Sequence, residues 1–101
     1  MKNSKINLPE KLFNDMGNFS TNVLSKADVE SHLNKLIIEA EEAKENPEDL
    51  SEFSDCLLAL FAAVHKAGYS YADFMNTTED KFKIVLKRKW VLLNDGTYQH
   101  K

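Results

Sequence analysis

The chain has 101 residues, with 13 Lys or Arg against 16 Asp or Glu and a net charge of -3. This length predicts a single small domain over residues 1–101, and the acidic balance argues against a binder of nucleic acid polymers, which is usually basic. The apolar run 56–64 is too short to cross a bilayer, and the N-terminus lacks the apolar segment of a signal peptide. Because Cys56 is the only cysteine, no intrachain disulfide can form, and a cytoplasmic protein without membrane contact is expected.

Residues 1–24 are read as an N-terminal segment. Apolar residues at helical spacing predict a short helix after Pro9 that ends near Gly17. These residues are Leu8, Leu12, Phe13, Met16 and Phe19. Core packing is their simplest role, and contact with a partner or one wall of a ligand site are the alternatives.

The next helix is predicted to open at a capping box of Ser25 and Asp28 and to end at about Glu45. Its apolar stripe has the helical period. The stripe consists of Val29, Leu33, Leu36, Ile37 and Ala40. Several acids cluster at its C-terminal end, where the helix dipole prefers cations. A local conflict of this kind is typical of functional sites.

The following helix is predicted to start with Asn46 as N-cap and Pro47 at its first position. It is expected to run to about Ala67 and to stop at Gly68. Because it is apolar around most of its circumference, we expect it to be the central, most buried helix.

The last predicted helix opens at Ser70, with Asp73 at capping-box spacing, and runs to about Trp90. Its C-terminal half is basic, which the helix dipole explains in part without any function. Residues 91–101 are predicted to form an irregular tail with a turn at 94–96. A short strand before this turn is the alternative, but a lone hairpin is marginal at this size.

Two carboxylate pairs flank the predicted turn at 46–49. The pairs are Glu39 with Glu42 and Glu52 with Asp55. A spacing of three residues places both members of a pair on one helix face, and two antiparallel helices can turn their pairs toward each other. Four convergent carboxylates repel one another unless a cation lies among them, and Mg²⁺ prefers oxygen ligands. A solvated acidic face is the alternative interpretation.

The other chemistry-bearing residues show weaker patterns. The three histidines, His32, His65 and His100, have no metal-ligand spacing, and the first two are predicted to be surface or core-edge residues. The basic C-terminal half of the last predicted helix contains Lys81 and Arg88. It suits a nucleoside triphosphate, whose negative charge a metal ion and cationic side chains neutralise together. Trp90 has a packing role or, alternatively, stacks on a base.

The acid pairs resemble the EExxE and ExxD motifs of the MazG-like all-α nucleoside triphosphate pyrophosphohydrolases. The chain looks most similar to the phage and prophage branch of dATP/dGTP diphosphohydrolases. Glu39 and Glu42 match the second and third acids of EExxE, and Glu52 and Asp55 match ExxD. Ile38 takes the place of the first acid of EExxE.

The resemblance extends over nearly the whole chain. Lys81, Arg88 and Trp90 match the third main helix of the branch, whereas Val85 stands where the branch has Asn. The segments DMGNFS and DGTYQH, near the two ends of the chain, are also similar to the branch. The order of these motifs is more specific than any one of them.

The resemblance implies an all-α fold, an antiparallel bundle of three main helices plus a short N-terminal helix. It implies cleavage of a nucleoside triphosphate, dATP or dGTP among the candidates, to the monophosphate and pyrophosphate. In this reading the acid pairs hold Mg²⁺, with Mn²⁺ as a substitute, and are the catalytic residues. The ion polarises the α-phosphate and activates a water, and one carboxylate, with Glu39 as a candidate, takes its proton. Lys81 and Arg88 offset phosphate charge, and Trp90 contacts the substrate.

The apolar surface of the predicted helices exceeds what one copy can cover, so a homodimer or homotetramer is expected. The family resemblance points the same way, since MazG-like domains commonly pair. The expected location is the cytoplasm of a bacterium or of a phage-infected host. A second function stays open at this point. Because Ile38 and Val85 depart from the family pattern, the chain is alternatively a non-catalytic helical interaction module with a degenerate metal site.

Overall fold

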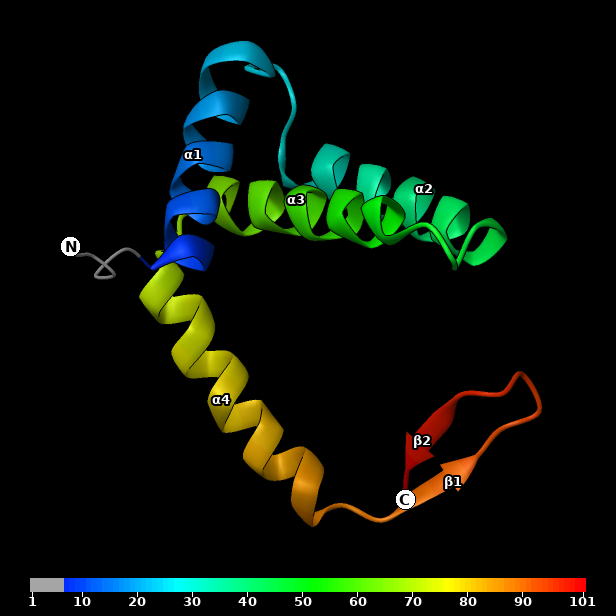
Figure 1. Cartoon of the computed structure of the whole chain (residues 1–101). Coiled ribbons are helices and arrows are strands. Elements are labelled where there is room, and N and C mark those ends of the chain that lie inside the picture. The colour runs from blue at the N-terminus through cyan, green and yellow to red at the C-terminus, as the bar shows by residue number, and fades with distance from the viewer. Residues whose placement is uncertain (1–6) are drawn as a thin grey trace, which may run out of the picture. The chain divides into compact units, whose positions relative to one another are not determined.

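The computed structural model describes residues 7–101, and the chain divides into two compact units that meet after Tyr71. Helices α1 (Leu8–Val23), α2 (Val29–Glu45) and α3 (Leu50–Lys66) form the first unit. The second contains α4 (Tyr71–Lys87), apart from its first residue, and the strands β1 (Trp90–Leu92) and β2 (Tyr98–His100) (Figure 1). The predicted all-α class is confirmed, and the single-domain organisation stays a prediction. No helix within residues 7–101 is long and apolar enough to cross a membrane.

Helix α3 is the centre of the first unit. Helix α2 lies antiparallel along it, and α1 packs against its C-terminal half (Figure 1). The buried apolar residues are Phe13, Ala43, Ala59, Phe61, Ala62 and Ala63, of which four belong to α3. Small alanine side chains there let the neighbouring helices approach closely. The prediction that this helix is the most buried is therefore confirmed.

An aromatic cluster holds α1 on α3. The Phe13 ring meets Phe61 edge to face, with centroids 5.3 Å apart. It also contacts His65 at 5.7 Å and Tyr71 at 5.9 Å. Edge-to-face aromatic pairs contribute about 0.5–1.5 kcal/mol beyond their burial. The apolar residues of the N-terminal segment thus include a main core contact of the first unit.

The N-terminal helix is longer than predicted. Helix α1 continues through Gly17 to Val23, so the prediction of a short helix ending near Gly17 is wrong. Gly17 is buried, and a Cβ at this position would overlap the His65 ring. The glycine therefore serves close helix packing, which local sequence cannot distinguish from a helix stop.

This contact leads to a stability prediction for Gly17→Ala. In an isolated helix the change would stabilise by about 1 kcal/mol. Here we expect a net loss of about 1–2 kcal/mol, because the new methyl group must displace the packed His65 ring. Urea unfolding of a double-mutant cycle measures the effect. In a His65→Ala background the same Gly17→Ala change should become stabilising, and a single variant more stable than the parent would contradict the packing argument.

Two helix starts lie later than predicted. The N-cap of α2 is Asp28, whose carboxylate accepts a hydrogen bond from the Ser31 amide at 2.8 Å. The N-cap of α3 is Asp49, which accepts from the Ser51 amide at 3.0 Å. The predicted caps at Ser25 and Asn46 are therefore wrong by three residues each. In both cases an Asp with Ser two or three positions later forms the actual cap.

The predicted helix ends near Glu45 and Gly68 and the start at Ser70 are confirmed. Helix α2 ends at Glu45. Gly68 follows the C-cap of α3 with a φ of +98°, the conformation that favours glycine after a helix. Helix α4 follows Ser70 directly but ends at Lys87 rather than Trp90.

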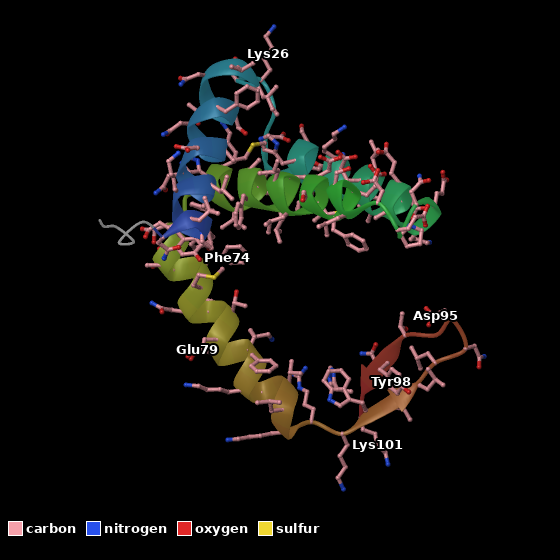
Figure 2. All side chains as sticks on the ribbon, in the orientation of Figure 1. Lys26, Phe74, Glu79, Asp95, Tyr98 and Lys101 are labelled. Carbon is pink, nitrogen blue, oxygen red and sulfur yellow. The ribbon has the colours of Figure 1, made fainter. Side chains whose placement is uncertain are left out.

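The tail is a β-hairpin, so the prediction of an irregular tail over 91–101 is wrong. Trp90 pairs with His100 and Leu92 with Tyr98 in an antiparallel register. At its turn the Leu93 amide donates to the Thr97 carbonyl at 2.7 Å, and Gly96 has a φ of +88°. This is the geometry of a three-residue hairpin loop with glycine in the left-handed region. Figure 2 shows Asp95 at the turn and Tyr98 on β2.

The hairpin contacts the end of α4, so the marginal stability of a lone hairpin does not apply to it. The Trp90 indole donates to the Val85 carbonyl at 3.2 Å. The Arg88 guanidinium lies 3.3 Å from Nδ1 of His100, whose ring meets Trp90 edge to face. The helix thus supplies contacts that a two-stranded ribbon lacks by itself.

Candidate active site

The two predicted carboxylate pairs lie on adjacent helices. Glu39 and Glu42 belong to α2, and Glu52 and Asp55 belong to α3, with the connection 46–49 between the helices. The Glu39 residue is only 9% exposed, Glu52 and Asp55 are partly buried, and Glu42 is exposed. Three of the four acids are therefore withdrawn from bulk water, unlike the acids of a solvated helix face.

The pKa of Glu52 reflects the negative charges that surround it. The pKa of its carboxyl is raised, first by partial removal of water and then by the negative charges of Glu42, Asp49, Asp55 and Glu39. Both causes penalise the ionised form. All the predicted site acids on the two helices therefore act on this one carboxyl. Their repulsion is the energetic problem that a bound cation would solve.

The donor set fits a hard divalent cation, because all four predicted ligands are carboxylates. Within residues 7–101, no group of three or more His, Cys, Asp or Glu side chains is close enough to hold a metal ion. The carboxylates would have to move closer together to coordinate one ion jointly. Lys35 provides a positive charge next to Glu39, since its ammonium lies 3.7 Å from the Glu39 carboxylate.

A pocket of about 210 Å³ lies among α1, α2 and α3 and includes two of the acids, Glu39 and Asp55. His32 and Lys35 also line it. The sequence prediction placed His32 at the surface or core edge, whereas the residue is only 5% exposed. Both residues were missed as site candidates. The available signal was the position of His32 seven residues and of Lys35 four residues before Glu39, which is helical spacing on one face.

The predicted phosphate-binding residues belong to the second unit. Lys81 is exposed on α4, and Arg88 follows the end of this helix. The Arg88 guanidinium contacts His100 of β2, and the Trp90 indole of β1 donates to the Val85 carbonyl of α4. Val85, which replaces the family's Asn, thus contributes through its main chain. Arg88, at the basic end of α4, and the Trp90 indole therefore both lie at the hairpin formed by β1 and β2.

The raised pKa of Glu52 leads to a prediction for the metal-free protein. At a pH well below the ordinary pKa of Glu, the parent and Glu52→Gln should be similarly stable, because both side chains are neutral. As the pH rises through the raised pKa, the carboxylate destabilises the folded parent, and Glu52→Gln should have the higher Tm. Thermal melting with EDTA between about pH 3 and about pH 8 measures this difference. A gap that narrows with rising pH would contradict the sign.

A helical bundle with acid pairs on two adjacent antiparallel helices is the arrangement that the sequence resemblance predicts for an all-α nucleotide pyrophosphohydrolase. The profile of the dATP/dGTP pyrophosphohydrolase family matches residues 12–101, and the chain belongs to this family. The predicted enzyme class, a hydrolase of nucleoside triphosphates, is thereby confirmed.

A solved structure is similar over nearly the whole chain. It is the MazG-like pyrophosphohydrolase of cyanophage S-2L, bound to dGDP and three catalytic Mn²⁺ ions per active site. The match has a TM-score of 0.77 at 18% sequence identity and covers 92% of this chain and 96% of that one. Likeness at this identity shows the MazG-like fold. No curated protein matches the sequence.

Proposed function

We propose that the chain hydrolyses dATP or dGTP to the monophosphate and pyrophosphate in a reaction that depends on a divalent metal ion. The observation that carries this proposal is the placement of the four predicted acids on the adjacent helices α2 and α3, with Glu39 and Asp55 in the wall of one pocket. Membership of the dATP/dGTP pyrophosphohydrolase family supports the substrate class. The Mn²⁺ ions and dGDP of the cyanophage relative support the metal and the purine deoxynucleotide.

The acids Glu39, Glu42, Glu52 and Asp55 would hold Mg²⁺, or Mn²⁺ as a substitute, through carboxylate oxygens. A bound ion of this kind supplies Lewis-acid polarisation of the α-phosphate and a more acidic water. One carboxylate of the set accepts a proton from the attacking water. The water oxygen forms a bond to the α-phosphorus, the bond to the bridging oxygen breaks, and pyrophosphate leaves with that electron pair.

Lys81 and Arg88 are proposed to offset the charge of the phosphates, and Trp90 to contact the substrate. Guanidinium groups suit phosphate oxygens because they donate two parallel hydrogen bonds. The contacts of Arg88 with His100 and of Trp90 with Val85 limit the rotamers of both side chains, which favours binding. We expect the enzyme to act in the cytoplasm, where its substrates occur, and as a homodimer or homotetramer.

The test is a screen of all canonical NTPs and dNTPs with Mg²⁺ and with Mn²⁺, with separate detection of pyrophosphate and orthophosphate. Chromatography of the nucleotide products identifies the bond that is cleaved. We expect a monophosphate and pyrophosphate from dATP or dGTP, and no turnover in excess EDTA. Orthophosphate as the first product, or no turnover of any nucleotide with either metal, would refute the proposal.

A further inference from the structure

The pocket among α1, α2 and α3 adjoins the proposed metal acids and has mainly apolar walls. Met16 and Leu24 contribute from the α1 side, and Leu58 contributes from α3. Its volume of about 210 Å³ is below the range of about 300–1,000 Å³ that encloses a whole drug-sized ligand. The pocket therefore suits one part of a nucleotide rather than all of it.

The connectivity of the substrate limits what this part can be. Two groups extend from the α-phosphorus, the nucleoside on its 5′ oxygen and the pyrophosphate on the bridging oxygen. If Glu39 and Asp55 act at the α-phosphorus, the pocket that they share receives one of these two groups. Pyrophosphate carries several negative charges and requires several cations or metal ions. Lys35 is the one Lys or Arg that lines the pocket, and its ammonium already faces Glu39.

His32 is the polar side chain in this wall that is neither a carboxylate nor a lysine. It is only 5% exposed, and its ring makes no hydrogen bond to any residue among 7–101. Within residues 7–101 only Ser20 Oγ is a fully buried side-chain nitrogen or oxygen without a partner, so the ring nitrogens of His32 keep access to solvent and are open to a ligand in the pocket that the residue lines. An imidazole can donate at one nitrogen and accept at the other, which matches the mixed donors and acceptors on the edge of a nucleobase.

We propose that this pocket binds the base of the substrate, with His32 as its hydrogen-bonding partner and the apolar side chains against the face of the base. The proposal rests on the proposed function, because it takes the α-phosphate to lie at the acids. It assigns a specificity role to His32 and places the pyrophosphate on the opposite side of the acids.

The test compares two probes that represent the two halves of the substrate. Titration calorimetry with Mn²⁺ measures binding of dGMP and of pyrophosphate to the parent and to His32→Leu, which has no hydrogen-bonding group. We expect the Kd for dGMP to rise about tenfold, the usual effect of one lost hydrogen bond, while the Kd for pyrophosphate changes less than about twofold. Steady-state kinetics with dGTP should show a similar rise in KM at nearly constant kcat.

Leu24→Trp provides a second variant in case His32→Leu does not fold. Leu24 is 40% exposed, so an indole can be accommodated and can fill the pocket without a change in the core. It should weaken dGMP binding about tenfold and leave pyrophosphate binding unchanged. Lys44→Ala is the matched control on α2, the helix of His32, because Lys44 is exposed and pairs with Glu41 away from the pocket.

The outcomes separate this inference from the proposed function. If the parent releases pyrophosphate from dGTP but neither variant changes dGMP binding, the base pocket is refuted and the enzyme assignment stands. Weaker binding of pyrophosphate alone, or equal weakening of both probes, would also refute the base pocket. A parent that releases no pyrophosphate and binds neither probe would refute the proposed function itself.

Discussion

Asp55→Asn and Glu52→Gln should each lower kcat/KM for nucleoside triphosphate hydrolysis by about a thousandfold, since each removes a charged metal ligand. The fold should remain intact or become more stable, because the variants relieve repulsion at the acid cluster. Pyrophosphate release measures the first effect. Calorimetric titration with Mn²⁺ and melting with EDTA measure metal binding and stability.

Glu48→Gln is the matched control for these variants. Glu48 lies in the connection between α2 and α3, is exposed, and is not among the proposed ligands. Its substitution should change kcat/KM by less than about twofold, as expected for a surface site. Parental activity in Asp55→Asn and Glu52→Gln would remove the site assignment. Failure of these variants to fold without metal would instead assign the acids a structural role.

Phe53→Glu is expected to weaken self-association by about a hundredfold or more, because it places a charge in an apolar interface. Leu50, Phe53 and Leu57 are 77%, 50% and 45% exposed, and their spacing places them on one face of α3. Apolar side chains at this spacing usually have a neighbour. We expect a second copy of the chain to cover this face in the homodimer or homotetramer.

Sedimentation equilibrium at micromolar concentration measures the effect of Phe53→Glu, with Leu8→Glu as the control. Leu8 is 59% exposed at the start of α1, where an acidic side chain is also favourable. A monomeric, active parent, or equal dissociation in both variants, would contradict an interface on α3. Phe61 is not suitable for this test, since it is only 3% exposed and packs on Phe13 within its own chain. Phe61→Glu would unfold the first unit.

The features predicted correctly from the sequence depend on local spacing. The number and approximate extent of the main helices follow from the 3.6-residue apolar period, and the stop at Gly68 follows from its tolerance of positive φ. Placement of the acid pairs on two adjacent antiparallel helices follows from their three-residue spacing and the short connection. The predicted N-caps differ from the observed ones because several polar residues near each helix start can act as a cap. Only the hydrogen bonds that form in the structure identify the N-cap.

The remaining features required tertiary structure, because each depends on contacts between residues that are distant in the sequence. Gly17 is identified as a packing position rather than a helix stop only by the His65 ring against it. The hairpin forms because the end of α4 supplies the Val85 carbonyl and Arg88 as partners. His32 is a core-edge residue by sequence pattern. It becomes a site candidate only because α1 and α3 pack around it and enclose a pocket next to Glu39 and Asp55.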